Sequence, residues 1–144
     1  MNEPDLYGVW GNMKQNESTS ERDKRIFREM KTAKKFGFGT GSRVMENSVI
    51  LGKNLISGTK VYVGHFCMLD ATQGLTIGDG TMIDDYVCIK THYHETRHPY
   101  KFKTAPTVIG KHCFIGAGVI IKAGSKIPDY TYVPPHTFYC WVPK

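Results

Sequence analysis

Three of the six histidines in this chain of 144 residues lie close together, at positions 92, 94 and 98, in the stretch KTHYHETRHPYKFKTAP. A neutral imidazole titrates near pH 7, so it suits the removal of a proton from a hydroxyl or amine that attacks a carbonyl. Histidines also suit zinc, which takes several nitrogen or sulfur ligands, and His65 and His112 add candidates. In a third interpretation the loop only covers a neighbouring subunit, and its histidines make structural hydrogen bonds.

The elements that position these histidines follow from an internal repeat of six residues. An aliphatic side chain returns at this spacing, and a smaller side chain stands two residues before most of these positions. The aliphatic positions are Met45, Leu51, Val63, Leu69, Ile77, Ile83, Ile89, Ile109, Ile115, Ile121, Ile127 and Val133; the smaller ones are Val49, Val61, Cys67, Thr81, Val87, Thr107, Cys113, Val119, Ser125 and Thr131. If each hexad forms a short strand and a turn, three hexads close a triangular coil that stacks on the next. The repeat therefore predicts a parallel β-helix, with the Gly or Asp after many aliphatic positions at corners that need unusual backbone angles.

The repeat has two irregularities. Two extra residues near Gln73 and Gly74 shift its phase once, and residues 90–106 interrupt it. The interruption is expected to project from the rigid coil as a loop, and such loops often carry functional residues.

An irregular arm and one helix are expected before the repeat. The pattern after Ser20 predicts a helix that begins there and packs through a stripe containing Ile26, Phe27 and Ala33. The predicted organisation is an arm and amphipathic helix over residues 1–40 and a β-helix over 41–144 with the loop 90–106. The helix also has a basic face, interpreted as solvated because acidic residues dilute it. The basic residues are Lys24, Arg25, Arg28, Lys31, Lys34 and Lys35, and the acidic ones are Glu21, Asp23 and Glu29.

The hexads of residues 41–144 resemble the left-handed β-helix of the hexapeptide-repeat acyltransferases, in particular the maltose- and galactoside-type and polysaccharide-biosynthesis O-acetyltransferases. The left hand is implied by this resemblance and not by the period. The stretch IGDGTMIDDYVCIKTHYH is similar to the family segment that ends in the catalytic histidine. Counting five residues from Ile89 assigns the base to His94, with His92 as the alternative. Asp70 matches the family carboxylate that contacts a sugar acceptor, and His92 and Asp84 are further expected acceptor contacts.

The resemblance also implies acetyl-coenzyme A as the acyl donor, held between two β-helices of a homotrimer. In TVIGKHCFIGAGVIIKAG, the expected donor-binding residues are Gly116, Ala117 and Gly118. Lys122 and Lys144 are expected near the phosphates of the donor. No metal is expected in such a site.

Composition and charge narrow the classes of function and partner that remain. The net charge of +6 falls entirely in residues 90–144, where a phosphorylated donor accounts for it without nucleic acid. No apolar run is long enough for membrane insertion, and the N-terminus lacks the order of a signal peptide, so a cytoplasmic protein with reduced cysteines is expected. The expected function is transfer of an acetyl group to a hydroxyl, or less favourably an amine, of a sugar-type acceptor. The alternatives are a zinc-dependent hydratase of the carbonic anhydrase type and a non-catalytic assembly module.

Overall fold

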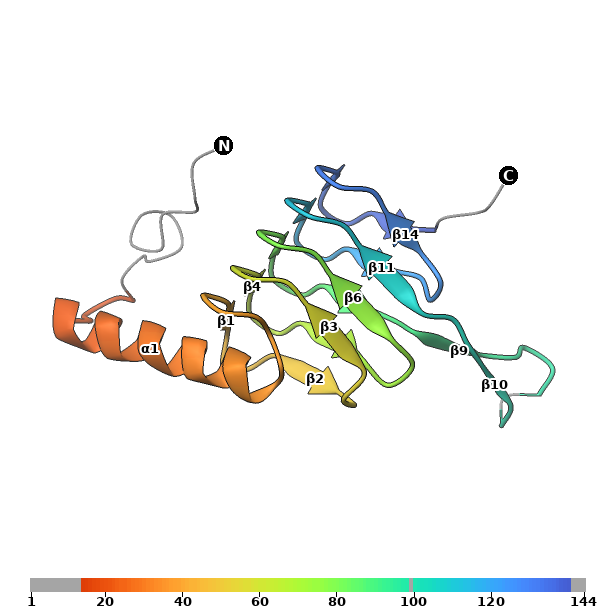
Figure 1. Ribbon diagram of the computed structural model, residues 1–144, viewed down its shortest axis with the longest axis horizontal. Helices are drawn as coiled ribbons and strands as arrows, with labels where there is room; N and C mark the ends of the chain where they lie inside the picture. The colour runs from red at the N-terminus through yellow and green to blue at the C-terminus, as the bar shows by residue number, and fades with distance from the viewer. Residues whose placement is uncertain (1–13, 99, 141–144) are drawn as a thin grey trace.

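The computed structural model describes residues 14–98 and 100–140, which form one helix followed by a three-sided coil of short strands (Figure 1). Sheet A contains β1 (Arg43–Val44), β4 (Tyr62–Val63), β7 (Met82–Ile83), β12 (Phe114–Ile115) and β15 (Tyr132–Val133). Sheet B contains β2 (Val49–Leu51), β5 (Met68–Asp70), β8 (Cys88–Ile89), β13 (Ile120–Ile121) and β16 (Phe138–Tyr139). Sheet C contains β3 (Leu55–Ser57), β6 (Leu75–Ile77), β11 (Thr107–Ile109) and β14 (Lys126–Ile127).

The chain passes through sheets A, B and C in turn, so each circuit adds one strand to each sheet. Neighbouring strands in these sheets are parallel, and Val44, Val63, Ile83, Ile115 and Val133 stand in one row of sheet A. The chain completes about five turns in this way. The predicted mainly β architecture, a parallel β-helix with an N-terminal helix, is confirmed.

Stacked aliphatic side chains fill the inside of the coil. Leu69, Ile83, Ile89, Ile115 and Ile121 have no exposed surface, as the repeat predicts. Each such side chain contributes roughly 1.5–3 kcal/mol through its removal from water. The core is therefore a narrow column that runs the length of the coil.

The first turn differs from the predicted phase by one residue. Val44 pairs with Val63 in the inward row, so Met45 is buried but lies outside that row. In β2 the expected inward residues Val49 and Leu51 are 51% and 41% exposed, because the residue between them takes the inward place. Side chains alternate between the two faces of a strand, so a shift of one residue exchanges inside for outside.

The glycines that follow the aliphatic positions mostly serve the spacing between turns, and the predicted reason, an unusual backbone angle, holds only for Gly52, with φ of 78°. Gly78 does not have a positive φ, but a Cβ there would lie 2.5 Å from the backbone nitrogen of Lys111. Positive φ occurs two residues later in the hexad, at Gly80 (69°) and at the equivalent Tyr86 (59°). At Gly78, close stacking of backbones, and not the backbone angle, therefore requires glycine.

Helix α1 (Thr19–Lys35) packs against β1 at the first turn of the coil (Figure 1). Its cap is Ser18, whose hydroxyl accepts from the backbone N–H of Glu21, so the expected cap Ser20 lies inside the helix. Ile26 is buried as predicted, whereas Phe27, about 100° further around the helix, is 72% exposed. In the part of the chain that the structure describes, no helix has the length and apolar character needed to cross a membrane.

A buried ion network joins α1 to the first strand. Glu29 accepts hydrogen bonds from Arg25 Nη1 at 3.0 Å and from Arg43 Nε at 3.1 Å. Arg25 Nε also donates to Glu17 at 2.9 Å. Removal of one partner from such a network leaves a buried charge without compensation, which costs roughly 3–5 kcal/mol. Arg25 and Glu29 therefore belong to the interior and not to the exposed face of the helix.

The segment 90–106 projects from the corner between sheets B and C, as expected, but as a β-hairpin (Figure 1). Strand β9 (His92–His94) pairs antiparallel with β10 (Phe102–Thr104). Phe102 stands opposite His94, and Thr104 stands opposite His92. Opposite residues share a face of a hairpin, so both histidines and Phe102 lie on one side.

Candidate active site

His92 lies at the base of the hairpin and is held by a carboxylate from the preceding turn of the coil. Its Nδ1 is 2.6 Å from Oδ2 of Asp70. Asp70 ends β5 and its side chain is completely buried, whereas the His92 side chain is 21% exposed. The stacking of successive turns therefore brings a buried acid against a histidine that solvent and ligands can reach.

Both oxygens of the Asp70 carboxylate accept hydrogen bonds. Oδ1 accepts from the backbone N–H and the hydroxyl of Thr72, at 3.0 and 2.5 Å. Oδ2 accepts from the backbone N–H of Thr91 at 3.0 Å in addition to His92. Burial raises the pKa of Asp70, but these hydrogen bonds outweigh the effect of burial and hold the pKa well below its usual range. Asp70 is therefore ionised at neutral pH.

The ionised carboxylate determines which ring nitrogen of His92 carries the proton. A carboxylate can only accept hydrogen bonds, so the neutral imidazole must carry its N–H on Nδ1. Nε2 is then left with a lone pair that can take a proton from a ligand. Asp70 also stabilises the imidazolium that results, so the pair has the chemistry of an oriented general base.

The corner between sheets B and C is irregular in two successive turns, and these irregularities lie against each other. The backbone N–H of Gln73 donates to the hydroxyl of Thr91 at 3.2 Å, and that of Thr107 donates to the carbonyl of Gly74 at 3.0 Å. The two extra residues that shift the repeat therefore support the base of the hairpin in the next turn. Both interruptions of the hexad pattern mark the same corner of the coil.

His94 lies further along the hairpin and is exposed. Its ring centroid is 5.5 Å from that of His92 and 6.5 Å from that of Phe102. Phe102 is 55% exposed and meets the His92 ring edge to face at 5.8 Å. The three rings form a cluster beside the Asp70 carboxylate, which contacts the His92 ring.

Asp84 and the expected donor-binding residues lie at a different corner, between sheets A and B. Asp84 follows β7, and its Oδ1 accepts from the backbone N–H of Asp85 at 2.8 Å. Gly116 follows β12 and is buried, while Gly118 donates through its N–H to the carbonyl of Asp85 at 2.9 Å. The carbonyl of Ala117 accepts from the next turn. Within one chain, these residues are separated from His92 by the width of sheet B.

Lys122 lies at the corner of the hairpin. It follows β13, and Lys90, which leads into the hairpin, donates through its backbone N–H to Ile121 at the end of the same strand. The side chain of Lys122 is exposed. Lys144, the other expected phosphate contact, lies outside the described residues. The structure therefore brings Asp70, His92, His94 and Lys122 to one corner of the coil.

Three residues of this site, Thr72, Thr91 and Phe102, were not predicted from the sequence. The two threonines carry a weak signal, since both lie beside an interruption of the repeat. Their role depends on contacts with Asp70 that only the stacked turns create. The only signal for Phe102 was its place in the interrupting segment.

Sheet B turns an apolar row outward. Val49, Ile120 and Phe138 are 51%, 44% and 62% exposed, and Met68 and Cys88 lie between them in register. Contiguous exposed apolar surface commonly marks a protein interface. This row lies between the corner that holds His92 and the corner that holds residues 116–118.

Among residues 14–98 and 100–140, no three or more His, Cys, Asp or Glu side chains are grouped so as to hold a metal ion.

No protein-family model matches the chain. The chain is similar to Nodulation protein L of Rhizobium leguminosarum bv. viciae and of Rhizobium meliloti (strain 1021), with 38% identity over 77 residues in each case. The match covers 51% of this chain and 40% and 42%, respectively, of these relatives. The similarity thus spans about half of this chain and less than half of each relative.

Proposed function

We propose that this chain transfers an acetyl group from acetyl-coenzyme A to a hydroxyl group of a sugar-type acceptor, with His92 as the general base. The observation that carries the proposal is the 2.6 Å contact between His92 Nδ1 and the buried, ionised Asp70. The coil of stacked hexads and its resemblance to the hexapeptide-repeat acyltransferases support the class of reaction. The exposed edge of His92 supplies the access that an acceptor needs.

In the proposed reaction, the acceptor oxygen attacks the thioester carbonyl while its proton passes to Nε2 of His92. The resulting imidazolium is stabilised by Asp70 through Nδ1–H. The tetrahedral intermediate then collapses, the bond between carbon and sulfur breaks, and the proton returns to the departing thiolate. The products are the acetyl ester and free coenzyme A, and no covalent intermediate with the protein is needed.

The structure favours His92 over His94 as the base. The resemblance assigned this role to His94 by counting residues along the chain, with His92 as the alternative. His92 is the histidine with a buried carboxylate on Nδ1, whereas His94 lies further from the coil on the exposed part of the hairpin. We assign His94 and Phe102 to the wall of the acceptor site, since their rings adjoin His92 and are exposed.

The donor is proposed to bind along residues 116–118 of one copy, with Lys122 at the hairpin corner of the neighbouring copy near its phosphates. Lys144 is proposed as a second phosphate contact. Because residues 116–118 and His92 lie at opposite edges of sheet B, one chain holds only half of this site. A second copy packed on the apolar row of sheet B would bring its own corner beside the hairpin of the first. This separation supports a homotrimer with shared sites, in which Asp84 contacts the acceptor from the neighbouring chain.

The test is the release of thiol from acetyl-coenzyme A by the purified chain with a panel of sugars and nucleotide sugars. With the best acceptor, His92→Ala should lower kcat by roughly 100-fold to 10,000-fold, the range that general base catalysis supplies. The matched variant His94→Ala should change mainly KM. Full activity of His92→Ala would contradict the assignment of the base, and absence of thiol release with every acceptor would contradict the reaction.

A further inference from the structure

The exposed side of α1 carries a row of cations opposite its packed face. Lys24, Arg28, Lys31 and Lys35 follow one another at helical spacings of four, three and four residues, which places them on one stripe. All four are exposed. Arg28 contacts Glu46 at 3.1 Å in an exposed ion pair, whereas the three lysines make no ion pair within the described residues. We name Lys24, Arg28, Lys31 and Lys35 the cationic stripe.

In the structure, acidic side chains do not dilute the positive charge of the cationic stripe, in contrast to the interpretation made from the sequence. Glu29, which the sequence places in the middle of the helix, is 2% exposed and is neutralised by Arg25 and Arg43. The other two helical acids, Glu21 and Asp23, lie in the first turns, before the stripe begins. From Lys24 onward, the exposed charges of α1 are therefore all positive.

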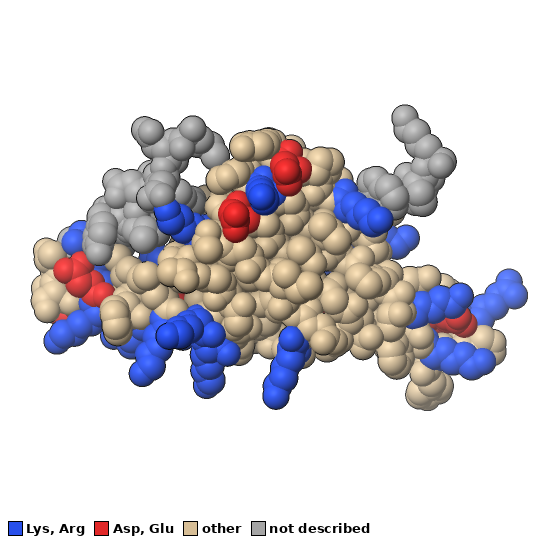
Figure 2. All heavy atoms as spheres, in the orientation of Figure 1, with Lys and Arg blue, Asp and Glu red and all other residues tan. Residues whose placement is uncertain are grey.

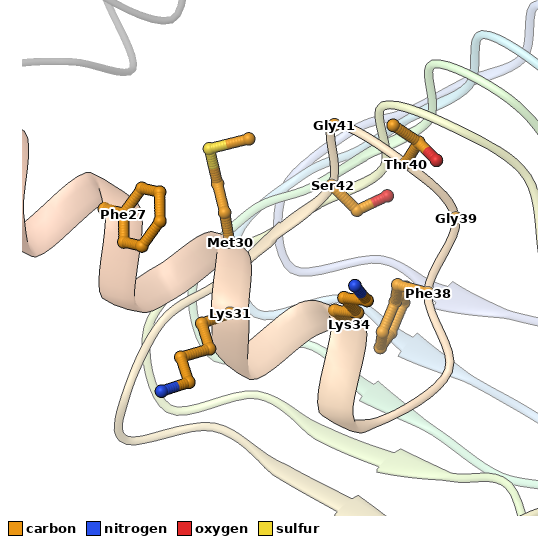
Figure 3. A pocket seen from close by; sticks show the side chains of 9 residues that line it. All are labelled: Phe27, Met30, Lys31, Lys34, Phe38, Gly39, Thr40, Gly41 and Ser42. Atoms are coloured by element: carbon orange, nitrogen blue, oxygen red, sulfur yellow. The ribbon is translucent and has the colours of Figure 1, made fainter.

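An apolar groove of about 630 Å³ adjoins the cationic stripe (Figure 3). It lies between α1 and the turn that leads into β1, and Phe27, Met30 and Phe38 supply its apolar lining. Lys31 and Lys34 also line it, so the groove and the stripe form one surface. An apolar groove with a cationic border matches a ligand that combines hydrocarbon with an anionic group.

The hairpin, on the same edge of the molecule, also carries exposed cationic and aromatic side chains. Figure 2 shows Lys and Arg side chains along the lower edge, over α1 and again over the hairpin. Lys101 and Lys103 belong to the hairpin, and Lys103 pairs with Glu95 at 3.6 Å. Beside them, Tyr100 is fully exposed. Aromatic side chains next to lysines are typical of surfaces that lie at a membrane interface.

We propose that this edge, made of the cationic stripe and its groove, docks the protein on an anionic lipid bilayer without insertion of a spanning segment. The stripe contacts the lipid phosphates, and Phe27 and the groove take up hydrocarbon at the boundary of the acyl chains. A nucleic acid would satisfy the cations but has no hydrocarbon for the groove, which is why the bilayer is favoured. The inference is independent of the proposed acyl transfer.

The test is sedimentation of the full chain with vesicles of 30% phosphatidylglycerol and 70% phosphatidylcholine, beside vesicles of phosphatidylcholine alone. Binding is expected only to the anionic vesicles and should weaken as salt rises. Lys31→Gln/Lys35→Gln should lower the partition coefficient about 30-fold, because each cation near an anionic surface contributes roughly fivefold. Phe27→Ala should also lower the partition coefficient relative to the unaltered chain. This loss should persist at high salt, because the contribution of Phe27 is apolar.

The matched control is Lys111→Gln/Lys126→Gln, which removes the same charge from exposed positions in later turns of the coil, away from α1 and its groove. This variant should bind anionic vesicles nearly as well as the unaltered chain. Equal losses in both double variants would show attraction by net charge alone and would overturn the docking surface. Equal binding to neutral vesicles would also overturn it, as would tighter binding to a DNA duplex than to anionic vesicles at the same salt.

Discussion

The substitution Asp70→Asn tests the central contact of the candidate site while it keeps the size of the side chain. The carboxylate accepts four hydrogen bonds, and the amide that replaces it offers only one oxygen. If that oxygen keeps the two bonds from Thr72, the amide nitrogen faces the backbone N–H of Thr91 and the ring of His92. Thr91 then has a buried donor without an acceptor, since a backbone N–H cannot reverse its role.

The expected loss of stability follows from these contacts. A buried N–H without a partner costs about 1–3 kcal/mol, and the bonds that lose a charged acceptor weaken further. We expect Asp70→Asn to lower the free energy of unfolding by about 2–4 kcal/mol near neutral pH. The folded-state pKa of Asp70 lies below its unfolded value of about 4, so its stabilising contribution is present above that pH and is lost as the pH falls. The difference between the two proteins should therefore shrink below about pH 4.

The expected loss of activity follows from the tautomer of His92. The amide nitrogen introduced by Asp70→Asn would donate to Nδ1, which moves the ring proton to Nε2 and removes the lone pair that takes the acceptor proton. We expect kcat to fall roughly 100-fold to 10,000-fold, the range for loss of a general base. KM for acetyl-coenzyme A should change little, because residues 116–118 lie at another corner and the contacts of Asp70 do not include Lys122.

The assay combines thiol release from acetyl-coenzyme A with denaturant unfolding of the same preparations at pH 7 and at pH 3.5. Asp79→Asn is the matched control, because Asp79 accepts one backbone N–H, from Thr59 at 2.8 Å, which an amide oxygen can also accept. The control should keep its activity and lose less than about 1 kcal/mol. An Asp70→Asn protein that kept activity within about threefold, under conditions where His92→Ala lost it, would refute the reasoning.

Two further predictions concern the stability and reactivity of the coil. Gly78→Ala should lower the free energy of unfolding by more than about 2 kcal/mol, because its Cβ would meet the backbone of Lys111. Gly37→Ala should lower it by only about 1 kcal/mol, because Gly37 has a φ of 91° but open space around it. Unfolding of both variants in urea measures the two losses. Burial raises the pKa of the Cys67 thiol, which keeps it unreactive in the folded protein. Alkylation of the folded protein at pH 8 should therefore modify the exposed Cys140 and leave Cys67 intact, and peptide mass mapping identifies the modified residue. Equal losses for the two glycine variants, or alkylation of Cys67 without unfolding, would contradict these accounts.

The hexad period was sufficient to predict the coil. Each turn places aliphatic side chains such as Ile83 and Ile115 in the same inward row, so the demand of a narrow core repeats along the sequence. The first turn was placed one residue late because Met45 and Leu51 are also apolar, and apolar character alone does not decide which neighbour faces inward. The projecting segment was predicted from the loss of the period, but its pairing as a hairpin was not.

The six-residue period and its interruption were enough to predict the architecture, the irregular corner and the set of histidines among which the base is proposed. The contact between Asp70 and His92 emerges only from the folded coil, because it depends on the length and register of a whole turn. Folding also buries Glu29 among arginines, which leaves the outer face of α1 cationic. Asp70 and His92 are 22 residues apart, and Glu29 and Arg43 are 14 residues apart. A periodic pattern predicts the core that repeats, but it does not predict such charge pairs, which occur only once.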